Sequence, residues 1–204
     1  MKKRFIKYLV LIILCQVFLF ITMSSYASNV SKDLKDNFFR LHIIANSDSL
    51  EDQSLKLKVR DAIIAYMKNL DPNISSKEES LIFVQNNLDN FKEIASKVIA
   101  DEGYTYPISL DVGTFYFPTK QYANLSLPAG YYDGLKIEIG NATGQNWWCS
   151  LFPPLCFVDV SSGILDDESS EKLEENLDDE EFAVITNNSK SVKLKFKVLE
   201  LLSK

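Results

Sequence analysis

The segment that most constrains the fold of this chain is 146–157, which reads Asn-Trp-Trp-Cys-Ser-Leu-Phe-Pro-Pro-Leu-Cys-Phe. It holds two adjacent tryptophans, a Pro-Pro pair, and two cysteines with six residues between them. This combination does not favour an ordinary strand or helix, because proline interrupts both. Behind a secretion leader it predicts a loop closed by a disulfide. Two large aromatic side chains held by a short covalent ring are typical of a rigid docking surface rather than of a catalytic centre.

The first 27 residues predict export. Basic residues at positions 2, 3, 4 and 7 precede a nearly continuous apolar run over 8–23, which is the pattern of a signal peptide. Small residues at Ser25 and Ala27 predict cleavage before Ser28. An uncleaved anchor is the alternative, since the run approaches the ~17–20 residues that span a bilayer. In both cases the basic flank keeps the N-terminus cytoplasmic and places the rest of the chain outside the cytoplasm.

Charge limits the partners of the exported part. Without residues 1–27, 18 basic residues stand against 28 acidic ones, a net charge of −10. This balance argues against nucleic acid or an anionic membrane surface, because both require a basic footprint. We expect membrane contact only through the leader, if it is not cleaved. Residues 28–204 are long enough for one core, and we predict a single globular domain.

The exported part has two cysteines, Cys149 and Cys156. An even count in an oxidising compartment favours a disulfide, with two buried thiols as the alternative. A zinc site needs more ligands than these cysteines and His42, the only histidine in the chain, can supply. We therefore expect no metal and no cofactor, and we expect no small-molecule ligand.

Hydrophobic periodicity predicts an α+β fold. An N-terminal strand over 38–45 is followed by two amphipathic helices, over 50–70 and 76–101. Ser49 with Asp52, and Ser76 with Glu79, have the spacing of capping boxes at the two helix starts.

A mainly antiparallel, β-rich half follows, ending in the disulfide-closed loop. Its expected strands cover 104–112, 114–117 and 132–139. We expect the acidic segment 166–181 to be a solvated helix or linker. The tail over 192–202 fits a strand that leads into a helical turn.

Three blocks of sequence carry a family resemblance. Residues 39–49 read Phe-Arg-Leu-His-Ile-Ile-Ala-Asn-Ser-Asp-Ser and continue to Asp61, and Tyr-Phe-Pro-Thr-Lys at 116–120 is followed by Leu-Pro-Ala-Gly-Tyr-Tyr at 127–132. The third and most specific block covers 144–159 and includes the tryptophans and cysteines. In this order, the blocks resemble the family of stage II sporulation protein R over nearly the whole exported chain.

The resemblance implies an intercellular signal of endospore-forming bacteria. Members of that family are made in the forespore and secreted into the space between forespore and mother cell. There they trigger a membrane-embedded aspartic protease, which matures sigma factor E from its precursor. The resemblance therefore implies a protein without catalysis of its own, which switches an enzyme on by binding it.

The tryptophan segment is the first expected binding surface. Trp147 and Trp148 are the candidate anchors, with Phe152, Pro153 and Pro154 beside them, because tryptophan dominates binding hot spots. Successive residues of an extended segment point opposite ways, so we expect one tryptophan to be free and the other to be core. The alternative is that both are buried.

The second expected surface lies where the first strand turns into the first helix of the domain. Ligand-facing edges of α/β folds are often formed at such positions. Its candidates are one strand residue, two turn residues and a polar helix stripe: His42, Asn46, Asp48, Gln53, Lys56 and Arg60. The alternative assigns Asn46 and Asp48 to turn and capping bonds, and His42 to a position under a loop.

An enzyme is the rival interpretation. A Cys-His hydrolase would use Cys149 as nucleophile and His42 as base, oriented by Asn46 or Asp48. A disulfide would make that thiolate inert. A glycosidase with paired carboxylates such as Asp111 and Glu138 is a further possibility, although nothing singles these residues out. A structural protein of the cell envelope forms a third class.

Overall fold

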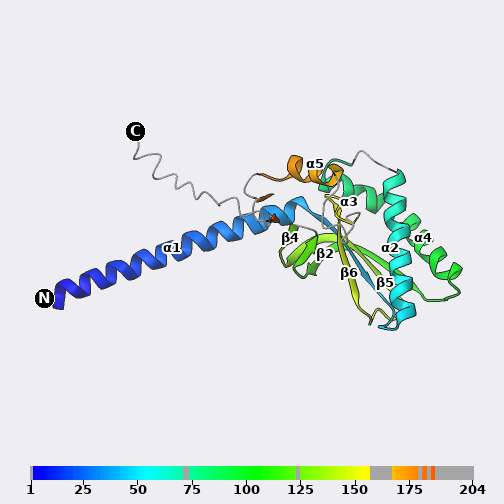
Figure 1. The fold of residues 1–204 in the computed structure, drawn as a ribbon, viewed down its shortest axis with the longest axis horizontal. Coiled ribbons are helices and arrows are strands. Elements are labelled where there is room, and N and C mark those ends of the chain that lie inside the picture. The colour runs from blue at the N-terminus through cyan, green and yellow to red at the C-terminus, as the bar shows by residue number, and fades with distance from the viewer. Residues whose placement is uncertain are drawn as a thin grey trace.

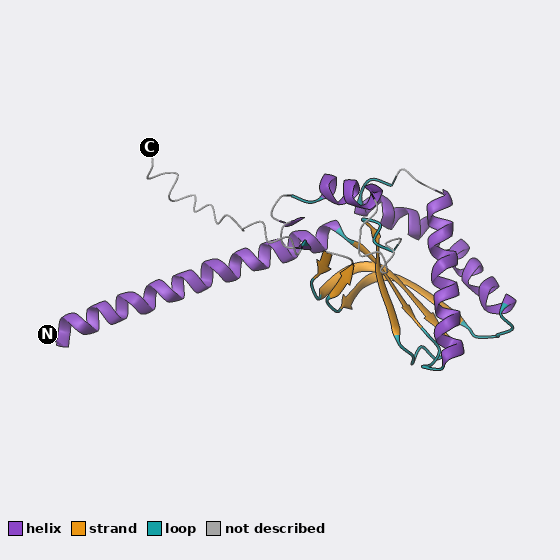
Figure 2. Ribbon diagram, in the orientation of Figure 1, coloured by secondary structure: helices purple, strands orange, loops and turns teal. Residues whose placement is uncertain are grey.

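A mixed four-stranded sheet forms the centre of the fold, with helices packed on one face (Figures 1 and 2). The computed structural model describes residues 2–70, 74–122, 125–156, 167–178, 181–182 and 185–186. The elements run in the order α1 (Lys2–Asn37), β1 (Phe39–Ile44), α2 (Leu50–Leu70), α3 (Lys77–Asn86), α4 (Leu88–Asp101), β2 (Ile108–Phe117), β3 (Lys120–Tyr122), β4 (Leu125–Leu127), β5 (Gly130–Ile139), β6 (Asn146–Phe152) and α5 (Asp167–Asn176). The α+β class is as predicted.

The strand order in the sheet is β2-β5-β1-β6. Strand β1 pairs parallel with β5 and antiparallel with β6, so Leu41 lies between Leu135 and Cys149. Strands β2 and β5 are antiparallel, as are β3 and β4 in a separate small sheet. Among the described strands, β1 therefore lies inside the sheet and β6 at one edge.

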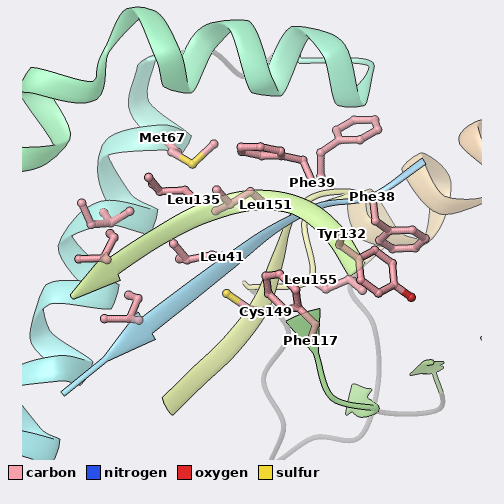
Figure 3. Close-up of a cluster of buried hydrophobic side chains, with 14 of the residues drawn as sticks. Phe38, Phe39, Leu41, Met67, Phe117, Tyr132, Leu135, Cys149, Leu151 and Leu155 are labelled. Carbon is pink, nitrogen blue, oxygen red and sulfur yellow. The ribbon is translucent and has the colours of Figure 1, made fainter. Parts of the chain in front are cut away.

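Helices α2 and α4 cover the face of the sheet that carries Leu41 (Figure 1). The apolar stripes of both helices are buried against this face, as Figure 3 shows for Met67 above Leu41 and Leu135. Burying each large aliphatic side chain contributes about 1.5–3 kcal/mol. The buried members of the α2 stripe are Leu55, Val59, Ile63 and Met67, and those of α4 are Phe91, Ala95 and Ile99.

The prediction of one helix over 76–101 is wrong, because the segment divides at Asn87 into α3 and α4. The Asn87 side-chain amide donates a hydrogen bond to the Phe83 carbonyl (2.9 Å). Asparagine offers the backbone such local alternatives to a continuing helix. The predicted start is confirmed, since the Ser76 hydroxyl accepts from the Glu79 N–H (3.1 Å).

Two strand predictions also need correction. Residues 108–117 form the single strand β2, because Gly113 pairs opposite Gly134 without interrupting the ladder. The segment expected to be a loop contains the regular strand β6, and its two prolines follow only after the strand has ended at Phe152.

The expected strand and helical turn over 192–202 lie outside the described residues. In the acidic segment, α5 is a helix that buries Leu173.

The described chain begins with a helix, α1, rather than with a strand. Within α1, Arg4–Ser25 is 22 residues long with a mean hydropathy of 2.4, and none of it is buried. This helix is long and apolar enough to cross a membrane, and a signal sequence has the same properties. The other end of α1 packs against β5 and buries Leu34. The predicted cleavage site, Ala27 and Ser28, lies within the helix.

Candidate functional site

The candidate site surrounds β6, the edge strand that carries both tryptophans. Alternation along the strand places Trp147 and Cys149 on the α2 side of the sheet, and Trp148 and Ser150 on the opposite side. The expectation that neighbouring tryptophans point in opposite directions is thus confirmed. Each indole is half-buried, so neither is a fully exposed anchor or a fully buried core residue.

Trp148 is held by aromatic contacts. Its ring stacks on the His42 imidazole, with ring centroids 3.6 Å apart, and meets Phe117 edge-on at 4.9 Å. His42 Nε2 is 2.6 Å from Asn146 Oδ1. Burial lowers the pKa of His42, which keeps the ring neutral at physiological pH. His42 therefore serves as a packing surface for the indole, and not as an exposed base.

A buried arginine supports the same side of the site. Arg40 is fully buried, with its guanidinium 4.3 Å from the Phe117 ring centre and 4.9 Å from that of Tyr132. Its Nη2 donates to the Tyr122 hydroxyl (3.1 Å), which in turn donates to the Trp148 carbonyl (3.2 Å). Burial raises the pKa of Tyr122, so the phenol keeps its proton and can donate.

Sequence reasoning missed Arg40 and Tyr122 as parts of the site. One signal was present, because Arg40 is a charged residue inside an otherwise apolar strand. A buried charge of this kind needs compensating partners. Nothing in the sequence paired it with Tyr122, which is 82 residues away.

Trp147 packs against α2. The Arg60 guanidinium lies 4.1 Å from the Trp147 ring centre and also pairs with Asp61 at 2.6 Å. The predicted disulfide between Cys149 and Cys156 is present, with the two Cα atoms 5.1 Å apart.

A groove of about 760 Å³ runs beside β6. Helix α2 forms one wall and β3 the other, and both tryptophans and both cysteines line it. Three basic residues, Arg60, Lys68 and Lys120, and one acidic residue, Asp61, complete the charged part of the lining. The groove lining therefore combines two indole rings with more basic than acidic side chains.

Three other residues of segment 146–157 that were expected on the binding surface are not exposed. Phe152, Pro153 and Pro154 are buried, which corrects the expectation that they line a docking surface. The chain reverses at this point, and the N–H groups of Leu155 and Cys156 both donate to the Ser150 carbonyl. Phe152, Pro153 and Pro154 therefore form the buried side of this turn.

The strand-to-helix turn forms a closed hydrogen-bond network around the buried Asp52. Asp52 Oδ2 accepts from the Asn46 amide (2.8 Å) and the Ser47 hydroxyl (2.5 Å), and the Asp52 N–H donates to Ser49 Oγ (3.1 Å). Burial alone would raise the pKa of Asp52, but the hydrogen bonds from Ser47 and Asn46 lower it overall. The predicted N-cap at Ser49 is confirmed.

The same turn is tied to the β5–β6 loop. Asn46 Oδ1 accepts from the Asn141 N–H (2.9 Å), and Asp48 Oδ1 accepts from the Gln145 N–H (2.7 Å). Lys56 Nζ donates to the Gln53 side chain (2.6 Å) and to the Gln145 carbonyl (2.9 Å). These bonds favour the turn-and-capping interpretation for Asn46 and Asp48. They also give Gln53 and Lys56 a structural role.

The geometry contradicts a Cys149–His42 hydrolase. Cys149 is cross-linked, and it lies on the opposite face of the sheet from His42. Of the carboxylates considered for a glycosidase, Glu138 forms an ion pair with Lys136 (3.2 Å), which lies directly opposite Asp111 in the sheet. Within the described ranges, no three His, Cys, Asp or Glu side chains are grouped so that they could hold a metal ion.

Comparisons with known proteins give a consistent result. The family model described as stage II sporulation protein R matches residues 35–162, a range that begins near the end of α1 and includes both β1 and β6. Stage II sporulation protein R of Bacillus subtilis (strain 168) is 37% identical over 173 residues, which cover 79% of this chain and 77% of that protein. No solved structure shows significant similarity.

Proposed function

The chain belongs to the stage II sporulation protein R family, and we propose that it is a secreted sporulation signal that acts by binding. It is made in the forespore and exported into the space between forespore and mother cell. There it activates a membrane-embedded aspartic protease, which cleaves the precursor of sigma factor E. This is the role that the family resemblance implies.

The observation that carries the proposal is the family match across the tryptophan strand and its groove. An activator shifts a protease toward its active form only by binding that form more tightly than the resting form. Trp147 and Trp148 are held in place by Arg60 and His42, so little conformational entropy is lost when a partner packs on them. Tryptophan and arginine are also the residues that most often dominate binding hot spots.

The N-terminal helix supports export. Its basic start and apolar run over Arg4–Ser25 suit a signal sequence. If a signal peptidase cuts before Ser28, replacing Ala27 with arginine leaves a longer, membrane-bound chain. Recovery of only the full-length chain from membranes of cells expressing the unaltered protein would favour an anchor.

Co-expression in a non-sporulating bacterium tests the proposal directly. The host makes this chain, the membrane protease and the sigma factor precursor, and precursor cleavage is followed by immunoblot. We expect cleavage only when all three are present and the protease retains its catalytic aspartate. A chain without residues 2–27, which stays in the cytoplasm, should not activate. Cleavage that occurs without the protease would instead make this chain an enzyme.

A further inference from the structure

We propose that the outer edge of β6 binds an extended, acidic segment of the partner protein by strand addition. This inference rests on the proposed function and specifies how the partner is held. In strand addition, main-chain hydrogen bonds to a free sheet edge supply affinity, and pockets for alternate side chains supply specificity.

The backbone of β6 presents this edge. The Trp148 carbonyl accepts from the Tyr122 hydroxyl, and the Ser150 carbonyl accepts from Leu155 and Cys156, so both point away from β1. In a strand, the N–H and C=O of one residue point to the same side and the side alternates with each residue. The N–H groups of Asn146 and Trp148 therefore also point outward.

Because they point away from β1, these N–H groups take no part in the ladder, and no loop or turn among the described residues accepts from them. A row of unpaired backbone groups on an edge strand is a template for pairing with another chain. Natural proteins protect such edges by covering, charging or shortening them. Among the residues that the structure describes, the edge instead faces a groove.

The groove lies where an added strand would run, along β6. It follows β6 between α2 and β3, with Trp147 toward one wall and Trp148 toward the other. Side chains of an added strand alternate between the two sides, so successive residues would meet successive tryptophans. Both indoles are already fixed by ring contacts, with Arg60 on one side and His42 on the other.

Charge selects the chemistry of the segment. The whole chain has a net charge of −6, yet the groove combines Arg60, Lys68 and Lys120 with one acidic residue, Asp61. Complementary charge steers association and rejects wrong partners. A segment with carboxylate side chains is therefore favoured, and a basic segment is disfavoured.

Amide exchange of the exported protein, followed by NMR, tests the open edge without reference to activity. The inward N–H groups of Trp147 and Cys149 are internal references because they belong to the ladder with β1. We expect the N–H groups of Asn146 and Trp148 to exchange at least 100-fold faster than these references. They should become slow when detergent-solubilised protease is added. Equally slow exchange in the protein alone would overturn the proposal, whether the cover is the chain after Cys156 or a second copy.

Matched substitutions at Asn146 test the edge in the co-expression assay. Asn146→Ala removes the side chain that contacts His42 but keeps the outward N–H, whereas Asn146→Pro removes the N–H as well. Proline is tolerated where the N–H of an edge strand faces outward. We expect the proline variant to need at least tenfold more protein for half-maximal activation than the alanine variant. Equal activation by the two variants would overturn strand addition.

A charge reversal covers the case in which Asn146→Pro does not fold. Lys120→Glu, on the groove, should weaken activation at least fivefold, whereas Lys97→Glu, on the exposed side of α4, should leave it unchanged. Equal effects of the two reversals would overturn the acidic segment. The unaltered chain is the reference in each experiment, and its failure to activate would contradict the proposed function itself, whatever the exchange rates at the edge.

Discussion

The Asp52 turn, residues 46–53, and strand β6 lie in two of the sequence blocks that define the family resemblance, but they differ in how their polar groups are used. In the turn, the side chains of Asn46, Ser47, Asp48 and Asp52 bond to one another or to the neighbouring loop. In β6, the side chains are packed while outward backbone groups face a groove. Polar residues beside a strand end can therefore be structural, while a strand with few polar side chains can offer the binding surface.

The largest expected effect comes from breaking the turn. Asp52→Ala removes the acceptor shared by Asn46 and Ser47, so two partly buried donors lose their partner. We expect a loss of about 3 kcal/mol in the free energy of unfolding, measured by urea denaturation. The exposed neighbour Glu51 is the control, and Glu51→Ala should change stability by less than ~0.5 kcal/mol.

The same residue gives a pH test. Because the folded-state pKa of Asp52 is lowered, its ionised form stabilises the fold above its unfolded pKa of about 3.8. This contribution is lost as the pH falls through the lower folded-state pKa, and Asp52→Ala should lack it. Equal losses in the free energy of unfolding in Asp52→Ala and Glu51→Ala would contradict a structural role for the hydrogen-bond network around Asp52.

The second effect concerns the covalent support of β6. Replacing Cys149 and Cys156 with serine should cost about 2.5 kcal/mol on the chain-entropy model, read as a lower thermal midpoint. Cys15→Ser, in the N-terminal helix, is the matched control and should have no effect on the domain. Thiol labelling of unfolded, unreduced protein should modify neither Cys149 nor Cys156, and labelling of both would contradict the disulfide.

The third effect concerns the aromatic walls of the groove. Trp147→Ala or Trp148→Ala should cost ~2 kcal/mol of binding free energy. The protein concentration needed for half-maximal activation should then rise roughly thirtyfold. Excess protein should partly restore activation, because a lost anchor lowers affinity. Tyr131→Ala, which removes an exposed aromatic outside the groove, should have little effect. A sharp fall in the thermal midpoint would instead identify that tryptophan as a core residue.

The smallest effect is a pH dependence through His42. Its folded-state pKa is lowered, so as the pH falls below about 6.5 the unfolded chain takes up a proton first and stability decreases. The slope is at most ~1.4 kcal/mol per pH unit and ends at the folded-state pKa. His42→Gln should remove this dependence.

His42 also separates binding from catalysis. His42→Ala should leave activation at saturating protein near normal, because the imidazole packs under Trp148 and is not exposed as a base. A catalytic base would cost orders of magnitude at saturation. Loss of maximal activation in a folded, exported His42→Ala variant would contradict a purely binding role.

Local sequence patterns predicted the elements whose structure depends on near neighbours. The α2 bounds agree with the predicted 50–70, and Ser49 and Ser76 cap their helices as expected. The cysteine count and export signal predicted the disulfide. The break at Asn87 and the short strands β3 and β4 were missed, because a single asparagine bond and three-residue strands leave little periodic signal.

Sequence by itself therefore determined the family, the α+β class, the disulfide and the opposite orientation of the two tryptophans, since each follows from residue type and spacing. Only the tertiary structure decided that β1 lies inside the sheet and β6 at its edge, because strand order depends on contacts between distant segments. That order buries Arg40 against aromatic rings from β2 and β5 and places Cys149 and His42 on opposite faces. It also leaves the backbone of β6, and not its side chains alone, facing the groove.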